Sequence, residues 1–421
     1  MKFALIGAGE RGTIYSQYAH DVCGHEIIAV ADRNPVKLAA AQARFGIPQD
    51  RCFGEGRELI ETIPPADALI IASLDREHYA HTMAALERGW NILLEKPISP
   101  DARECIAIRD KAQEKGCKIT ICHVLRYAPL FVALKELIAG GKLGKVVAID
   151  LTENVGNFHM AHSFVRGNFR NSGITSPMIM QKSCHDMDML LWLTGSHAKS
   201  ISSVGSLSYF KPSNAPAGSA ERCLDCSVAQ SCRFDARKAY MPSMGDWPAR
   251  MLTPDQTKEG LYQAFREGPY GRCVFHCDND VCDHQSTAIE FENSVTATFT
   301  LSGMTNIMHR TIHVMCEDGE IFGDDDKGEL RVANFRSNQS DPFTEQTIHI
   351  GTVLGNHGGG DVGLMNDFIA SLKPAYDGEC RSSIRKSVES HLMACAAEES
   401  RISGKTIHLD AFEQALKNAK E

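Results

Sequence analysis

Residues 1–123 alternate short apolar runs with segments of helical periodicity. The apolar runs have the length and composition of buried strands and lie at residues 2–6, 26–31, 68–72, 91–94 and 118–122. The helical segments between them lie at residues 14–22, 35–45, 78–88 and 102–115. Strands that alternate with helices of this length form right-handed βαβ units. We therefore predict an α/β domain built on a doubly wound parallel sheet.

From residue 124 onwards the periodicity changes. Apolar and polar residues alternate, as in half-buried strands, at residues 146–155, 288–301, 312–316, 329–332 and 347–350. Helical periodicity is clear at residues 186–193 and 385–399. Strands that follow one another without helices favour an antiparallel sheet. Residues 124–421 are therefore predicted to form an α+β domain with a large, mostly antiparallel open sheet.

A cysteine-rich insertion is predicted within this second domain, at about residues 206–282. Residues 206–271 are rich in Ser, Pro, Gly and Cys and have no sustained period. A segment of this length without regular structure is untypical of a domain core. We therefore expect a long insertion outside the domain core.

The overall composition restricts the classes of partner. The 421 residues exceed what one hydrophobic core usually supports, which agrees with two domains. A net charge of -9 argues against nucleic acid or an anionic membrane as the main partner. No apolar run is long enough for a membrane span, and residues 1–6 lack the features of a signal peptide. We expect a cytoplasmic protein with mostly free thiols among its fifteen cysteines, acting on a small molecule.

A dinucleotide-binding motif follows the first predicted strand. The glycines of Gly7-Ala8-Gly9-Glu10-Arg11-Gly12 have the G-x-G-x-x-G spacing that allows a tight turn, close approach of a pyrophosphate and close helix–strand packing. Asp32 ends the second strand, where a carboxylate binds the adenosine ribose and repels a 2′-phosphate. This favours NAD, while Arg33 offers a cation that would suit NADP.

A lysine follows the fourth apolar run of the first domain. Glu95-Lys96-Pro97 lies at the carboxyl end of the predicted strand 91–94, the edge where open α/β sheets bind ligands. A lysine beside a nicotinamide can polarise a carbonyl or move a proton. The alternative is a surface lysine in a turn.

Four segments together resemble the Gfo/Idh/MocA oxidoreductases, the glucose–fructose oxidoreductase and inositol dehydrogenase family. The first is the glycine motif. The other three are Ser73-Leu74-Asp75-Arg76-Glu77-His78, Glu95-Lys96-Pro97 and Cys184-His185-Asp186-Met187-Asp188-Met189-Leu190-Leu191-Trp192-Leu193. The resemblance implies a Rossmann domain and a second domain whose open sheet serves substrate binding and assembly into a homodimer or homotetramer. It implies NAD(P)-dependent chemistry at a ring hydroxyl or ketone of a sugar, sugar derivative or cyclitol.

The resemblance also implies roles for individual residues. Lys96 is the expected acid/base lysine and His185 the second catalytic position. The expected cofactor contacts are Gly7, Gly9, Glu10, Arg11, Gly12, Asp32, Arg33, Ser73, His78, Glu95 and Lys96.

One position departs from the family pattern. The family usually has an aspartate four residues before the histidine, where this chain has Gln181, followed by Lys182. If Lys182 faces the pocket, it takes part in proton relay or binds an anionic group of the substrate. If Lys182 faces solvent, the relay consists of Lys96 and His185 alone. Neighbouring residues of an extended segment face opposite sides, so the sequence leaves both cases open.

Substrate contacts are expected from polar residues near the predicted domain junction and the start of the second domain. Asn154, His159, Ser163 and Asn168 contribute to a polar segment that suits a molecule with many hydroxyls, and the alternative is a solvated loop. The candidate substrate-binding residues are His123, Arg126, Tyr127, His162, Arg166, Gln181, Asp188 and His284.

The cysteines of the insertion have the spacing of a metal site. Cys223-x2-Cys226-x5-Cys232 begins like a zinc knuckle, with Cys273 or Cys277 as the fourth ligand. Because the insertion has little apolar content, a structural zinc ion would supply folding energy. An iron–sulfur cluster or unligated thiols are the alternatives.

Three functions follow from these observations. The first is an NAD(P)-dependent sugar or cyclitol oxidoreductase. The second is an NAD-dependent glycoside hydrolase that acts by transient oxidation, elimination, hydration and re-reduction, with Lys182 or His284 as the additional base. The third is a non-enzymatic sensor, against which the presence of both Lys96 and His185 argues.

Overall fold

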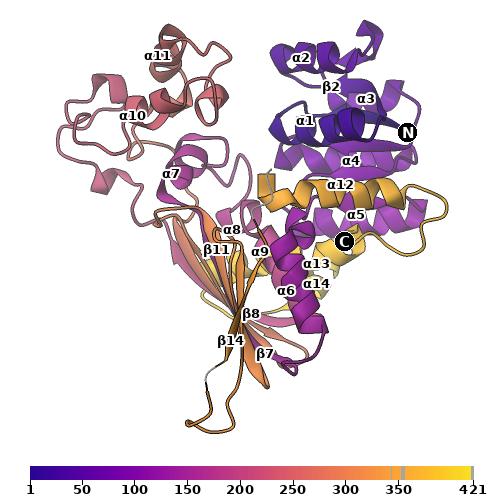
Figure 1. The fold of residues 1–421 in the computed structure, drawn as a ribbon. Helices are drawn as coiled ribbons and strands as arrows, with labels where there is room; N and C mark the ends of the chain where they lie inside the picture. Colours follow the sequence, from indigo (N-terminus) through magenta and orange to yellow (C-terminus); the bar gives the residue numbers. More distant parts are fainter. Residues whose placement is uncertain (343, 352–355, 419–421) are drawn as a thin grey trace.

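The computed structural model describes residues 1–342, 344–351 and 356–418, which build two sheets (Figure 1). One sheet is six-stranded and parallel, and the other is nine-stranded and mostly antiparallel. The predicted fold class is therefore confirmed. No helix of the described residues is long and apolar enough to cross a membrane.

The parallel sheet has the strand order β3-β2-β1-β4-β5-β6, which is doubly wound about β1 and β4. Its strands are β1 (Lys2–Ile6), β2 (Glu26–Ala31), β3 (Cys52–Phe53), β4 (Ala68–Ile71), β5 (Ile92–Leu94) and β6 (Ile119–Ile121). The helices beside it are α1 (Glu10–Gln17), α2 (Pro35–Phe45), α3 (Gly56–Thr62), α4 (His78–Glu87) and α5 (Ala102–Lys115). Strands β1, β2 and β4 are almost entirely buried, because helices cover both faces.

Local capping explains why helix α2 begins and ends where its sequence predicts. The Asn34 side chain accepts hydrogen bonds from the backbone amides of Val36 and Lys37, and Pro35 occupies the first helical position. Gly46 then ends the helix in a left-handed conformation with φ 64°.

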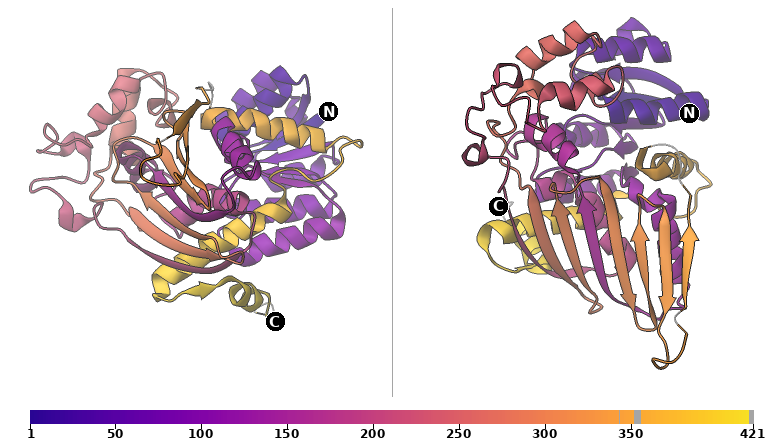
Figure 2. Two further views of the ribbon diagram at one scale, coloured as in Figure 1. Left: turned by 60° about the horizontal axis from the view of Figure 1, so that its bottom comes forward. Right: turned by 60° about the vertical axis from the view of Figure 1, so that its left-hand side comes forward.

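The second sheet has the order β14-β13-β12-β11-β7-β10-β9-β8-β15 and forms one curved layer (Figure 2). Its strands are β7 (Val146–Asn154), β8 (Ala198–Ser206), β9 (His284–Phe291), β10 (Thr296–Ser302), β11 (His309–Cys316), β12 (Gly319–Asp324), β13 (Glu329–Asn334), β14 (Glu345–His349) and β15 (Ile407–His408). Burial alternates along β9 and β10, so one face packs on helices and the other is largely exposed.

Further helices come from the part of the chain that follows residue 124. They are α6 (Pro129–Ala139), α7 (Asn157–His159), α8 (Met178–Gln181), α9 (Cys184–Thr194), α12 (Gly360–Ser371), α13 (Ile384–Ser403) and α14 (Leu409–Asn418). Helix α13 packs on α9, β8 and α5. Helix α12 lies beside the helices of the parallel sheet (Figure 1), where Leu364 and Phe368 share a core with Phe3 and Tyr15. Helix α12 follows the predicted domain boundary at residue 123 in sequence but packs beside the first sheet. The predicted division of the chain at that residue therefore stays a prediction.

The cysteine-rich insertion projects from the sheet between β8 and β9 (Figure 1). It contains the helices α10 (Ala236–Tyr240) and α11 (Lys258–Glu267) with short 3-10 turns. A small apolar core of its own includes Tyr240, Leu261 and Phe265, all fully buried. The expectation that residues 206–271 have no sustained period is wrong for α11, where Leu261 and Phe265, four residues apart, lie on one helix face in this core.

Candidate active site

The three glycines of the motif have different surroundings. Gly7 has φ +90°, and a Cβ added there would lie 2.4 Å from the carbonyl oxygen of Ala72. A Cβ at Gly12 would lie 2.0 Å from the carbonyl oxygen of Gly7, so only glycine allows α1 to pack so closely on the turn. At Gly9 no atom lies within 4 Å of the Cβ position, which leaves the backbone open to a ligand. These surroundings fit a dinucleotide.

A cavity of about 290 Å³ lies beside this motif, lined by Gly7, Gly9, Asp32, Arg33 and Ser73 among others. The Asp32 carboxylate accepts hydrogen bonds from the backbone amides of Ala8, at 2.8 Å, and Asn34, at 2.7 Å. These bonds fix the carboxylate at the cavity while leaving lone pairs for further donors. Ribose hydroxyls are such donors.

Arg33 is held by two carboxylates. Its Nε lies 2.9 Å from Glu55 Oε2, and its Nη2 lies 3.2 Å from Glu77 Oε2. Both glutamates line the same cavity. Since the guanidinium already has anionic partners, it is less available to a 2′-phosphate.

His78 has a different place from the one expected. Its ring is buried, with Nδ1 2.7 Å from the carbonyl oxygen of Pro97 and Nε2 3.0 Å from that of Ser73. His78 thus connects the loop after β4 to the loop after β5. Through these contacts it supports Ser73, which lines the cavity.

Lys96 connects the edge of the parallel sheet to helix α8, which lies beyond residue 124. The residue follows β5, and its Nζ donates a hydrogen bond to the backbone carbonyl oxygen of Gln181 at 2.9 Å. Gln181 ends helix α8, and His185 lies in the first turn of α9. The structure therefore brings Lys96 together with the segment that carries Lys182 and His185.

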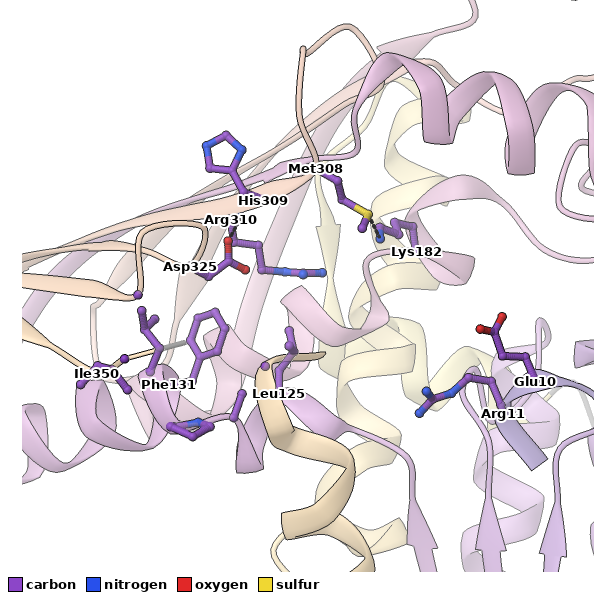
Figure 3. A pocket seen from close by; sticks show the side chains of 16 residues that line it. Glu10, Arg11, Leu125, Phe131, Lys182, Met308, His309, Arg310, Asp325 and Ile350 are labelled. Carbon is purple, nitrogen blue, oxygen red and sulfur yellow. Dashed lines mark hydrogen bonds between the residues drawn. The ribbon is translucent and has the colours of Figure 1, made fainter. Parts of the chain in front are cut away.

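Lys182 faces a second cavity, of about 400 Å³, between the two sheets. In Figure 3, Lys182, Met308 and Arg310 enter it from one side, and Glu10 and Arg11 from the other. Lys182 Nζ lies 3.3 Å from Glu153 Oε1 and 3.6 Å from Met308 Sδ. The question that the sequence left open is answered by the short helix α8, which turns this lysine to the cavity.

Burial lowers the pKa of Lys182 below that of an exposed lysine. The Glu153 carboxylate opposes this effect, whereas the charges of Arg310 and Lys96 add to it. The net direction is downward, so this amine loses its proton more readily than the amine of an exposed lysine. A neutral amine accepts a proton, so this lysine has the electrostatic setting of a base.

Glu153 and Arg310 form an ion network behind Lys182 that sequence reasoning missed. Arg310 pairs with Glu153, and its Nε lies 2.7 Å from Asp186 Oδ1. Burial raises the pKa of Asp186 to about 6, although Arg310 opposes the shift. Glu153 and Arg310 lie on β7 and β11, which are remote in sequence, and strand patterns do not identify such partners.

Glu10 and Arg11, both expected at the cofactor, line the 400 Å³ cavity on the side opposite Lys182. Arg11 Nε lies 2.9 Å from Glu95 Oε1, and its guanidinium also pairs with Asp361 at the start of α12. Glu10 Oε1 lies 3.3 Å from Arg250 Nη2 of the insertion. The start of α1 is therefore fixed by ion pairs to α12 and to the insertion.

Several expected substrate contacts lie beneath the cavity instead. Arg126 Nε and Nη2 donate to the two carboxylate oxygens of Asp188 at 2.6 and 2.8 Å. Tyr127 donates to Asp367 at 2.7 Å. His123 is fully buried, and its ring makes an edge contact with that of His185 at 5.6 Å. These residues support the segment that carries His185.

His162, Arg166 and His284 face neighbours in or near the insertion. His162 stacks on Tyr270 with ring centroids 4.8 Å apart. Buried Arg166 donates through Nε and Nη2 to the backbone carbonyl oxygens of Arg272 and Phe234, both at 2.7 Å. The half-exposed His284 ring lies 2.8 Å from Asp283 Oδ1.

The structure does not support the expected zinc site. No group of three or more His, Cys, Asp or Glu side chains in the described part of the chain is arranged to hold a metal ion. Arg166 Nη2 lies 3.4 Å from Cys223 Sγ, and Cys277 Sγ donates to the backbone oxygen of Cys273. The expected ligands, which are all free thiols, are Cys223, Cys226, Cys232, Cys273 and Cys277. The apolar core around Phe265 provides the folding energy that was ascribed to metal.

Comparison with known proteins identifies the family. Residues 1–123 match the family described as "Oxidoreductase family, NAD-binding Rossmann fold", and residues 135–409 match its partner description, "Oxidoreductase family, C-terminal alpha/beta domain". This chain belongs to the Gfo/Idh/MocA oxidoreductase family. The predicted resemblance is therefore confirmed, and NAD binding by the first domain with it.

Among Gfo/Idh/MocA relatives, the putative oxidoreductase YteT of Bacillus subtilis is 23% identical over 83% of either chain. An inositol 2-dehydrogenase of Klebsiella pneumoniae is 27% identical over 203 residues, 48% of this chain and 56% of that protein. Two solved structures have TM-scores of 0.70, a levoglucosan dehydrogenase with NADH and an Agrobacterium radiobacter oxidoreductase with NAD+, L-tartaric acid and magnesium. They are 20% and 15% identical and cover 97% and 98% of this chain and 99% of their own. They share its fold.

The Asp32→Asn variant tests the adenosine half of the site. Losing charged hydrogen bonds of roughly 1.5–3 kcal/mol should weaken NADH binding by about ten- to a hundredfold, measured by calorimetry. Asp50→Asn, at an exposed turn, is the matched control and should bind like the wild type. Equal NADH affinity in all three proteins would contradict the assignment.

Removal of metal tests the correction about the insertion. Treatment with a strong chelator should leave the melting temperature unchanged, because the insertion is held by its apolar core. The Phe265→Ala variant should lose about 3–5 kcal/mol of unfolding free energy, measured by denaturant titration. A fall in melting temperature on chelation, with release of one zinc ion per chain, would contradict this view.

Proposed function

We propose that the protein is an NAD-dependent dehydrogenase or reductase that acts on a ring hydroxyl or ketone of a sugar, sugar derivative or cyclitol. The observation that carries the proposal is the hydrogen bond from Lys96 to the backbone of Gln181, which lies next to Lys182 at the 400 Å³ cavity and four residues before His185. Relatives named as inositol and levoglucosan dehydrogenases support the substrate class.

Each residue has a proposed role at the reacting oxygen. Bound NAD supplies the hydride acceptor or, when reduced, the hydride donor. Lys96, fixed by the Gln181 carbonyl, holds the substrate oxygen and stabilises the developing alkoxide. His185 and Lys182 exchange the proton, since imidazole and amine side chains both act as general acids and bases and burial lowers the pKa of Lys182. Glu153 and Arg310 position Lys182.

NAD is the proposed coenzyme in preference to NADP. Asp32 presents a carboxylate to the ribose position, and Arg33 is paired with Glu55 and Glu77. A 2′-phosphate would meet the carboxylates of Asp32, Glu55 and Glu77 around the Arg33 guanidinium, whose charge the two glutamates already neutralise. These negative charges would repel it.

A homodimer or homotetramer is proposed as the assembly, formed through the open face of the second sheet. Small and polar side chains on this face include Ser286, Ala288, Thr296 and Thr298, which are exposed.

The Lys96→Met variant tests the catalytic proposal. Removing an acid/base group should lower kcat about 10²- to 10⁴-fold, while NADH binding measured by calorimetry stays close to the wild-type value. Lys142→Met, at an exposed loop lysine, is the control and should retain full activity. A Lys96→Met enzyme with wild-type kcat would contradict the assigned role.

The Glu153→Gln variant tests the setting of Lys182. Glu153 raises the pKa of this lysine, so its neutralisation should lower that pKa further. The limb of the kcat–pH profile for alcohol oxidation that reports the free amine should then move to lower pH. Glu320→Gln, at the His313 pair on the sheet, should leave the profile unchanged. A shift to higher pH, or none, would exclude Lys182 as the titrating base.

A redox-neutral glycoside hydrolase is the second candidate, favoured by the extra amine of Lys182 at the cavity. Elimination of an aglycone requires a base at the carbon next to the transient ketone, and an amine with a lowered pKa suits that task. Incubation of aryl glycosides with catalytic NAD distinguishes the two functions. Aglycone release without NADH accumulation would select hydrolysis, and stoichiometric NADH would select net oxidation.

A further inference from the structure

Exposed apolar side chains border the Lys182 cavity. Met308, whose Sδ lies 3.6 Å from Lys182 Nζ, lines the cavity and is 52% exposed. Beyond it the connection between β10 and β11 runs beside α7, where Asn157 donates to the backbone oxygen of Thr305 at 2.7 Å. Phe158 and Trp247 are 38% and 39% exposed. Exposed apolar groups gathered at one place mark binding surfaces.

Phe158 of α7 and Trp247 of the insertion form a ring pair. Their ring centroids lie 6.1 Å apart at an angle of 76°. Trp247 also contacts the rings of His159, at 6.3 Å, and His162, at 5.7 Å. Phe158 belongs to α7 of the second domain and Trp247 to the insertion, so residues remote in sequence build one aromatic surface.

His159 connects this aromatic surface to the proposed catalytic lysines. The chain enters α7 from Gly156, where a Cβ would lie 3.5 Å from Met308 Cβ, and Met308 in turn contacts Lys182. Burial lowers the pKa of His159, and the charges of Lys182, His162 and Lys96 lower it further. The same ring contacts Trp247. A molecule that reacts at Lys96 and extends past His159 therefore meets the indole of Trp247.

Buried contacts hold the aromatic surface in place. Beneath it, His162 packs between Tyr270 and Tyr240, and its Nδ1 lies 3.2 Å from the Tyr240 hydroxyl. Arg250, three residues after Trp247, pairs with Glu10 at the dinucleotide motif. These contacts connect the insertion to the segment that follows α7 and to the start of α1, so the exposed rings lose little conformational entropy when they bind.

We propose that Trp247 and Phe158, together with His159, form a subsite for a second ring of the substrate, so the preferred substrates are glycosides or disaccharides. The inference rests on the proposed function, whose reacting sugar ring lies at Lys96. Aromatic faces next to polar groups suit the apolar C–H face of a sugar or the ring of an aglycone. Binding at this remote ring improves the orientation of the reacting carbon.

The test compares free sugars with their methyl glycosides and disaccharides in the wild type and in Trp247→Ala. The variant should raise KM for the glycosides by about tenfold or more and change KM for the free sugars about twofold or less. Trp247→Phe should restore most of the glycoside affinity, because it keeps an aromatic face. Phe335→Ala removes another exposed aromatic side chain, 59% exposed and outside this surface, and is the control.

Several outcomes would overturn the subsite. They are an equal KM change for free sugars and glycosides, no change for either, or a rise in the Kd for NADH as large as the rise in KM. The last result would assign the rings to the coenzyme.

A second readout separates this inference from the proposed function. If no sugar is oxidised, the proposed function fails, but binding is still visible in tryptophan fluorescence. Trp247 is exposed, whereas Trp90 is fully buried and Trp192 is partly buried. Quenching by disaccharides that is present in the wild type and absent in Trp247→Phe would support the subsite. Quenching that is equal in both proteins, or absent from both, would overturn it.

Discussion

Glu95 is the fixed point on which the site depends. Its buried carboxylate accepts hydrogen bonds from Arg11 Nε at 2.9 Å, the Tyr15 hydroxyl at 2.7 Å and the Lys96 amide at 2.7 Å. Burial raises the pKa of this carboxyl, but the charges of Arg11 and Lys96 outweigh it, so the net pKa is lowered and the group stays ionised. One anion thereby fixes both α1 and the backbone of Lys96.

The charged groups of the site divide into two kinds. Some are neutralised where they lie, such as Arg126 by Asp188 and Arg33 by its two glutamates. These groups position segments and do not reach the 400 Å³ cavity. Lys182, by contrast, lines the cavity with a lowered pKa. The effect of burial on the pKa of Lys182 outweighs the effect of its ion pair with Glu153. A side chain with such a shifted pKa is suited to act as a general acid or base.

The sequence predicted the first sheet well, because local signals mark its elements. Asn34, Pro35 and Gly46 are strong end signals for α2, and the two-residue strand β3 was missed because it is too short to show a period. For the second sheet, the sequence predicted a mostly antiparallel open sheet. It did not predict which face of this sheet the helices cover.

Side-chain directions in the site were less accessible to sequence reasoning. The spacing around Lys182 was read as extended or turned, whereas α8 is helical up to Gln181. Arg166 was expected at the substrate, yet backbone carbonyls of the insertion bind it. Glu153 and Trp247 carried no motif, since their importance comes from neighbours remote in the chain. Tertiary contacts, and not local patterns, decide such positions.

The central claim is that a nicotinamide ring and a carbohydrate carbon meet beside Lys96. Its most direct test is hydride tracing, with NADH deuterated at the nicotinamide C4 position and a panel of keto sugars and keto cyclitols. Mass spectrometry should find one deuterium on a ring carbon of at least one product. Retention of all deuterium on the coenzyme across the panel, in a protein that binds NADH, would contradict the account.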